Sequence, residues 1–227
     1  MFGIKTHLVA IIMTFGLAVA PLAQADSDQQ NLVERARITV DDLRKDQEFG
    51  NARELIKSAK GIMIVPSLVR GGFFIGGEGG EGVLLTRSGV NDWSHPAFYT
   101  LASASFGLQI GLEESELVLF VMSDRALNDF MSDEFKIGAQ AGLAIVTLGS
   151  TAEASTTTNL HADIIIWSSN TGAYAGLTLN GSLIKPRDTW NEAYYGRPES
   201  VRDIVAKRSV QNPGAAGLRQ ELAAISG

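Results

Sequence analysis

The sequence predicts an α+β domain in which N-terminal helices pack on a strongly curled, mainly antiparallel β-sheet or small barrel. Two observations lead to this fold class. Apolar residues first recur with the helical period, and from Gly61 onward they fall in short β segments separated by glycine-rich turns. Helices followed by hairpins, without alternating βαβ units, are typical of α+β domains. Glycines on the faces of the predicted strands indicate tight curvature or the close approach of another backbone.

Residues 1–25 are predicted to be an export signal that takes no part in this fold. Lys5 and His7 give a short basic start, an apolar run covers residues 8–20, and Ala23-Gln24-Ala25 has the small-x-small pattern of a cleavage site. We therefore expect a mature chain that begins at Asp26 and is periplasmic or secreted. An uncleaved anchor is the alternative, but the apolar run is shorter than the ~20 residues that span a bilayer.

The composition excludes several classes of function. The 227 residues include 19 Lys and Arg, 25 Asp and Glu, and no cysteine. Removing the signal takes away one of the 19 basic side chains and no acidic one, which leaves a net charge of −7. An acidic chain is not expected to be a general nucleic-acid binder. The absence of cysteine excludes a lipoprotein, a disulfide framework, a thiolate nucleophile and a Cys-based metal site.

Two helices are predicted before the β region. The first covers residues 29–45 and the second covers residues 52–59, with Asn51 as its N-cap and Gly61 as its stop. The apolar face of the first helix is formed by Leu32, Ala36, Val40 and Leu43. Spacings of four, four and three residues place these side chains on one side of a helix, which indicates that they face the core.

Short β segments fill most of the remaining chain. The predicted strands are residues 62–65, 83–86, 106–112, 117–122, 137–147, 163–167 and 174–184. We expect Pro66 to end the first of these, residues 113–115 to form a polar turn, and the last two to pair as a hairpin. The strand at 117–122 is apolar on both faces, which predicts a central position in the sheet.

Helices are also expected late in the chain. Asp124 is the predicted N-cap of a short helix that ends at Met131. A further helix is predicted for residues 200–207, followed by a weak alanine-rich segment after Pro213-Gly214. Trp190, Tyr194 and Tyr195 are interpreted as a structural aromatic cluster.

A literal G-x-G-x-x-G pattern occurs at Gly77-Glu78-Gly79-Gly80-Glu81-Gly82. In a dinucleotide site this pattern follows a strand and opens a helix, so that the helix N-terminus meets the pyrophosphate. Here a β run follows directly, and the two glutamates would repel phosphate. We interpret these glycines as a flexible or sharply bent hairpin connection.

No catalytic residue, metal ligand or cofactor is predicted. His161 and Asp163 are close in sequence, but no G-x-S-x-G nucleophile motif accompanies them, so a hydrolase is only a minor alternative. His95 lies in a Trp-Ser-His-Pro loop, where we expect a hydrogen-bonding role. The sequence contains no H-E-x-x-H, EF-hand or Walker lysine motif.

Six side chains form the predicted lipid-binding site. They are Arg53, Lys57 and Lys60 on the second helix and just after it, then Arg70, Phe73 and Phe74. The cations would meet anionic headgroups, each contributing about 1 kcal/mol near the surface, while the glycine-flanked aromatic loop would enter the membrane interface. The alternatives are a solvated helix face for the basic residues and core packing for the two phenylalanines.

Several ordered motifs resemble the SYLF domain family, also called the Ysc84 actin-binding domain family. They are residues 59–66 (AKGIMIVP), 71–77 (GGFFIGG), 82–84 (GVL), 93–99 (WSHPAFY), 107–111 (GLQIG), 172–177 (GAYAGL) and 194–196 (YYG). The resemblance spans about residues 32–196. It indicates a lipid-binding domain at residues 26–196, followed by a helical tail at residues 197–227.

The resemblance implies a non-enzymatic phospholipid-binding module, whose eukaryotic members bind phosphoinositides and actin filaments. Bacterial members are typically exported and stand alone. An exported chain would not meet actin in its own cell, so the expected partner is an anionic phospholipid surface at the periplasmic side of a membrane. The alternative is a structural or interaction protein of the cell envelope, with a protein partner or apolar ligand on the glycine-bare face of Gly107, Gln109 and Gly111.

Overall fold

A curled sheet covered by helices forms the centre of the computed structural model, which describes residues 27–45, 52–72, 75–106, 111–137, 145–148, 162–169, 179 and 181–226. The strands are β1 (Gly61–Gly72), β2 (Ile75–Gly89), β3 (Asp92–Trp93), β4 (Ala97–Phe106), β5 (Gly111–Val121), β6 (Phe135–Lys136), β7 (Ile145–Leu148), β8 (Ile164–Ser168) and β9 (Leu183–Pro186). The helices are α1 (Asp28–Lys45), α2 (Ala52–Ser58), α3 (Asp124–Phe130), α4 (Asp188–Tyr195), the π-helix η2 (Asp203–Lys207), the 3-10 helix η3 (Pro213–Ala215) and α5 (Ala216–Ser226).

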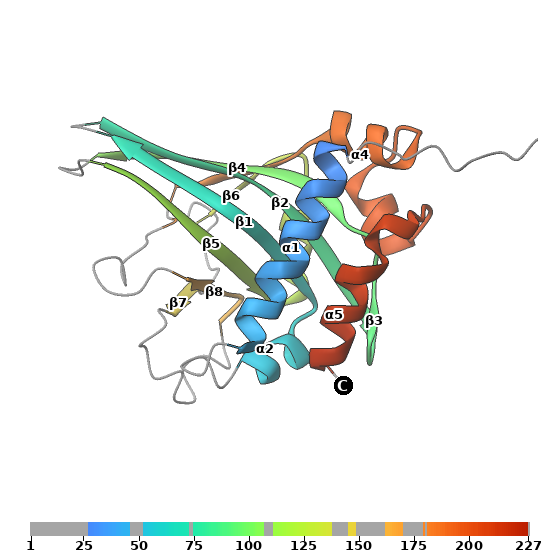
Figure 1. Ribbon diagram of the computed structural model, residues 1–227. Coiled ribbons are helices and arrows are strands. Elements are labelled where there is room, and N and C mark those ends of the chain that lie inside the picture. Colours follow the sequence, from blue (N-terminus) through green and yellow to red (C-terminus); the bar gives the residue numbers. More distant parts are fainter. Residues whose placement is uncertain are drawn as a thin grey trace, which may run out of the picture.

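The strands form one sheet in the order β6-β9-β4-β2-β1-β5-β8-β7, and β3 pairs with β2. Among the described pairings only β7 with β8 is parallel. Figure 1 shows this curled sheet with α1 and α5 lying side by side across one of its faces. The α+β class and the curled antiparallel sheet predicted from the sequence are confirmed. Within the described segments, no helix is both long and apolar enough to cross a membrane.

The sheet is buried on both faces, because alternate residues of its central strands enter two different cores. Ile62 and Ile64 of β1 pack with α1, α2 and α5, whereas Met63 and Val65 pack with α3 and η2 on the other face. Strand β5 lies between β1 and β8 and is fully buried from residue 117 to residue 121. Its predicted central position is therefore confirmed.

Helix α1 agrees with its predicted range and apolar face. Leu32, Ala36, Val40 and Leu43 are all buried against the sheet and α5. Helix α2 also agrees, and Ala59 directly after it is buried. The alanine-rich segment near the C-terminus, which gave only a weak pattern, forms α5 and packs along α1.

The prediction that Pro66 ends a strand is wrong, because β1 continues to Gly72. The pairing of β1 shifts register between Val65 and Leu68 on both of its sides. Proline has no N–H for a ladder hydrogen bond, so a strand tolerates it at an irregularity of this kind.

The glycine run at 77–82 lies inside β2, so its interpretation as a hairpin connection is also wrong. The irregular segment of β1 explains the glycines. A Cβ atom on Gly80 would lie 2.4 Å from the carbonyl oxygen of Ser67, and one on Gly82 would lie 2.8 Å from that of Ile64. The backbone of β1 therefore occupies the space that side chains would need. The close approach of another backbone, which the strand glycines indicated, is confirmed here.

The polar residues 113–115 belong to β5, although a turn was predicted. Glu114 pairs with Val69 of β1 and keeps its side chain exposed, so the strand tolerates its charge. The predicted strand at 106–112 instead spans the end of β4 and the start of β5, and residues 107–110 lie outside the described residues. The sequence prediction missed β4 as an element.

The remaining boundaries differ in smaller ways. Ser123, and not Asp124, caps α3, because its hydroxyl oxygen accepts a hydrogen bond from the backbone N–H of Ala126 at 3.2 Å. The strand at 163–167 is confirmed as β8. Strand β9 pairs with β4 and β6, while residues 171–178 of the predicted hairpin lie outside the described residues, as does the predicted signal at 1–25.

Candidate functional site

Two of the predicted lipid-binding cations lie together where α2 meets β1. The ammonium group of Lys57 is 3.5 Å from the carboxylate of Glu54, and that of Lys60 is 2.9 Å from the carboxylate of Asp124. The side chains of Lys57 and Lys60 are 34% and 43% exposed, so both remain accessible from solvent. Arg53 is also in α2, but its side chain lies outside the described part of the chain.

A third cation, Arg87 of β2, joins this group, and the sequence analysis missed it. Its Nη1 atom donates hydrogen bonds to the carbonyl oxygens of Ile56, at 3.1 Å, and Lys57. Its Nε atom donates to the carbonyl oxygen of Gly89 at 3.1 Å. The guanidinium group therefore caps the C-terminus of α2, where the helix dipole favours a positive charge. No carboxylate of the described residues forms an ion pair with Arg87. We call Lys57, Lys60 and Arg87 the basic end.

Arg70 does not join the basic end. It lies ten positions after Lys60 along the extended β1 strand, a separation of about 30 Å. Its guanidinium group is 2.7 Å from the carboxylate of Glu78, and the two side chains are only 16% and 3% exposed. The structure thus commits Arg70 to a buried ion pair. Phe73 and Phe74 lie outside the described residues.

The aromatic residues of α4 have the structural role expected of them. The rings of Tyr194 and Phe98 pack edge to face with their centres 5.0 Å apart, and the hydroxyl of Tyr195 donates to the carbonyl oxygen of Pro96 at 2.5 Å. Burial raises the pKa of both tyrosine hydroxyls well above the ordinary value, so neither is suited to proton transfer near neutral pH.

His95 accepts a hydrogen bond at Nδ1 from the backbone N–H of Asn212 at 3.3 Å, which agrees with the hydrogen-bonding role predicted for it. Its other ring nitrogen faces the guanidinium of Arg219 at 3.4 Å. Burial lowers the pKa of His95, and the positive charges of Arg219 and Arg208 lower it further. The protonated ring would place a third positive charge beside two arginines.

We expect His95 to make the folded protein less stable in mild acid. Because its pKa in the fold lies below the ordinary value of 6.5, the unfolded chain binds the proton more readily. The stability contributed by neutral His95 is present above pH 6.5 and is lost as the pH falls through the folded-state pKa. Urea unfolding at about pH 7.5 and about pH 5.5 measures this loss. The loss should shrink in His95→Gln, and an equal loss in both proteins would contradict the prediction.

Of the two residues of the minor hydrolase alternative, the structure describes only Asp163. Asp163 accepts a hydrogen bond from the hydroxyl of Ser123 and lies 3.4 Å from the guanidinium of Arg125. These contacts fix the start of α3. His161 lies outside the described residues. Within the described segments, no three His, Asp or Glu side chains are grouped so that they could hold a metal ion.

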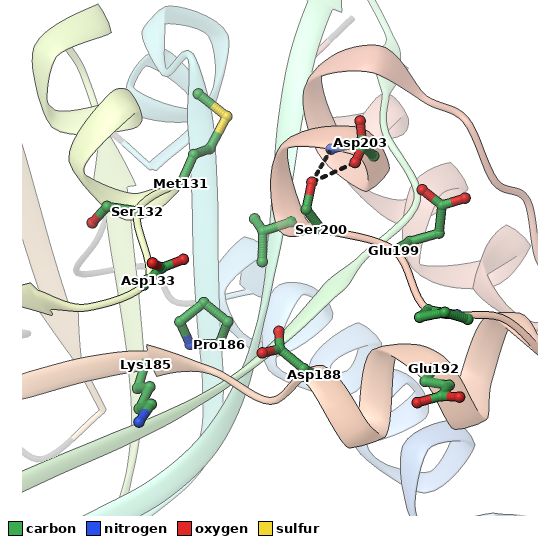
Figure 2. Close-up of a pocket in the computed structure, with 12 residues that line it drawn as sticks. Met131, Ser132, Asp133, Lys185, Pro186, Asp188, Glu192, Glu199, Ser200 and Asp203 are labelled. Atoms are coloured by element: carbon green, nitrogen blue, oxygen red, sulfur yellow. Dashed lines mark hydrogen bonds between the residues drawn. The ribbon is translucent and has the colours of Figure 1, made fainter.

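An acidic pocket of about 490 Å³ lies between β9, α4 and the chain that leads into η2. Figure 2 shows its charged lining residues, which are one cation, Lys185, and the carboxylates Asp133, Asp188, Glu192, Glu199 and Asp203. Because these residues come from three separate segments, no single sequence pattern predicts the pocket. Glu199 and Asp203 form ion pairs with Arg197 and Lys207, each at 2.7 Å. The other three carboxylates favour a positively charged ligand or protein segment.

The acidic pocket and the basic end share two neighbouring elements. The hydroxyl of Thr86, next to Arg87, donates a hydrogen bond to the carbonyl oxygen of Val205 at 2.5 Å, and Asp203 of the pocket lies two residues before Val205 in η2. Asp124, the ion-pair partner of Lys60, begins α3, and Asp133 of the pocket follows the end of that short helix. The two surfaces are therefore distinct but lie on adjoining parts of the fold.

Comparison with known proteins places this architecture in a family. A family profile described as "Ysc84: Las17-binding protein actin regulator" matches residues 102–225, which is more than half of the 227 residues. This chain belongs to the Ysc84 family. The matched range runs from β4 into α5 and contains every residue of the acidic pocket. The family resemblance stated from the sequence motifs is confirmed, and the family description supports a binding role without catalysis.

Individual relatives in the Ysc84 family are similar over a shared region only. The SH3 domain-containing YSC84-like protein 1 of Rattus norvegicus is 29% identical over 152 residues, which cover 66% of this chain and 44% of that protein. Protein YSC84 of Saccharomyces cerevisiae is 29% identical over 164 residues, covering 71% and 35%. LAS seventeen-binding protein 3 of the same species is 27% identical over 180 residues, covering 76% and 39%. The chain spans less than half the length of these relatives.

Proposed function

We propose that this Ysc84-family chain is an exported, non-enzymatic protein that binds anionic phospholipid at the periplasmic surface of a membrane. The observation that carries the proposal is the basic end. Lys57, Lys60 and Arg87 converge there from α2, the start of β1 and the end of β2, because the backbone N–H of Arg87 donates to the carbonyl oxygen of Lys60 at 2.8 Å. Such a group of cations attracts anionic headgroups with about 1 kcal/mol per residue.

Because the chain as a whole is negatively charged, this docking mode requires a local group of cations at the membrane surface. The ion pairs of Lys57 and Lys60 are exposed, and exposed pairs contribute only about 0–1 kcal/mol, so lipid phosphates can replace Glu54 and Asp124 at little cost.

Charge reversal tests the proposal. Lys57→Glu/Lys60→Glu should weaken binding to vesicles of phosphatidylcholine and phosphatidylglycerol in equal parts by at least about tenfold, measured by co-sedimentation. The matched control is Arg35→Glu/Lys136→Glu, which changes the net charge equally at two exposed cations of α1 and β6. The control should bind as well as the unaltered protein. Equal recovery of the unaltered protein on pure phosphatidylcholine, or no effect of the first pair, would refute the proposal.

A protein partner is the second candidate, and the acidic pocket is the observation that favours it. The family description and the name of the yeast relative both refer to binding of Las17, so protein binding is a property to test in this chain. A basic segment of a partner would complement the pocket carboxylates. In that case the chain would form a stable hetero-complex without binding vesicles, and Asp188→Lys/Glu192→Lys would abolish the complex.

A further inference from the structure

We infer that the hairpin joining β2 to β3 is the part of the protein that enters the bilayer, with Val90 at its tip buried below the headgroups of an anionic membrane. This inference rests on the proposed function and identifies the element that inserts. It differs from the expectation drawn from the sequence, which placed insertion at Phe73 and Phe74.

Val90 is the most exposed large hydrophobic side chain of the described residues. Its exposed fraction is 73%, compared with 44% for Ile38 and 39% for Val69. Val90 occupies the turn between β2 and β3, where a polar or small residue would serve the fold equally well because its side chain packs against little of the protein. Transfer of an apolar side chain at a loop tip from water into a membrane interface lowers the free energy, so it favours binding.

The hairpin is held in place on both sides of its tip. Arg87 fixes the strand before the turn through its hydrogen bonds to Gly89 and to the C-terminus of α2. Arg208 fixes the strand after the turn, because its Nη1 atom lies 2.7 Å from the carboxylate of Asp92. Asn91 completes the turn in the left-handed region with a φ of 60°. The tip is therefore pre-organised, and binding needs to order little of it.

The cations of the basic end lie at the base of the hairpin. Arg87 is three residues before Val90, and its hydrogen bonds to α2 and its backbone contact with Lys60 bring both lysines to the base of the hairpin. Figure 1 shows α2, β3 and the C-terminal end of α5 at the same end of the molecule. This order suits a bilayer, in which the apolar tip reaches past the headgroups while the ammonium and guanidinium groups stay level with the phosphates.

A single cysteine can report the depth of the hairpin, since the chain contains no cysteine of its own. Val90→Cys would be labelled with the environment-sensitive fluorophore NBD and mixed with the phosphatidylcholine/phosphatidylglycerol vesicles described above. Ile38→Cys on α1 and Val69→Cys on β1 are the matched controls, because both replace exposed aliphatic side chains on other elements. Val69 also lies four residues from Phe73, so its probe reports on the end of the sheet where insertion was first expected.

The inference requires a blue shift and increased NBD emission at position 90 when anionic vesicles are added, with little change at positions 38 and 69. In unlabelled protein, Val90→Ser should reduce vesicle affinity by roughly threefold while the unfolding midpoint stays the same. If the protein co-sediments with vesicles but NBD at position 90 does not respond, or only NBD at position 69 responds, hairpin insertion is refuted while lipid binding is still supported. Failure to co-sediment at all would instead overturn the proposed function and the hairpin with it.

Discussion

Replacing Gly80 with alanine is expected to lower the free energy of unfolding by about 2–3 kcal/mol. The added methyl group would lie 2.4 Å from the carbonyl oxygen of Ser67 and 2.9 Å from a methyl carbon of Val65. The carbonyl oxygen belongs to the backbone of β1, which is held between β2 and β5, so it cannot move aside as a flexible side chain would. Urea unfolding followed by circular dichroism measures the loss.

Two other glycines of β2 are control positions, because replacing them tests the general effect of losing a glycine without the clash. A Cβ atom on Gly79 would be 3.6 Å from the carbonyl oxygen of Leu101, an ordinary contact, and one on Gly89 would have no neighbour within 4 Å. Alanine at either position should change the free energy of unfolding by less than about 1 kcal/mol. If Gly80→Ala were as stable as Gly79→Ala, the close approach of the two backbones would not be the reason for the glycines.

The elements that could be predicted from the sequence are those with a clear local period. The apolar face of α1 can be recognised from residues of that one segment, and so can the central part of β5, which is apolar on both faces. Both were predicted correctly. Pro66 and Glu114 were misread as strand breakers because local preference disfavours them in strands. Pairing on both sides of β1 overrides that preference, and a register shift at Pro66 removes the conflict.

The candidate site was predictable only in part, for a related reason. Lys57 and Lys60 could be found because they share one short segment. Arg87 and Val90 could not, since they join the lysines only through the antiparallel register that places Thr86 opposite Gly61. Strand pairing also explains why Arg70 is not part of the basic end, because the register of β1 and β2 places Glu78 directly opposite Arg70. A charge read from the sequence as available for lipid is thereby neutralised inside the protein.

The Arg70–Glu78 pair gives the second large expected effect. Arg70→Met should lower the free energy of unfolding by about 3–5 kcal/mol, because it leaves the carboxylate of Glu78, 3% exposed, without its partner. The double variant Arg70→Met/Glu78→Leu should recover most of this loss, since apolar side chains of similar size need no compensation for desolvation. A double-mutant cycle in urea measures the coupling between the two positions.

An exposed ion pair provides the control for that cycle. Vesicle binding of the double variant then tests whether Arg70 has a role in lipid binding as well as in stability. Arg35 and Glu114 are 53% and 61% exposed, so Arg35→Met should cost less than about 1 kcal/mol. The double variant at 70 and 78 should also bind anionic vesicles as well as the unaltered protein, because Arg70 is turned toward Glu78 and lies about 30 Å along β1 from Lys60. If the double variant folded normally but lost vesicle binding, Arg70 would have to contribute to lipid binding, and the basic end alone would not explain docking.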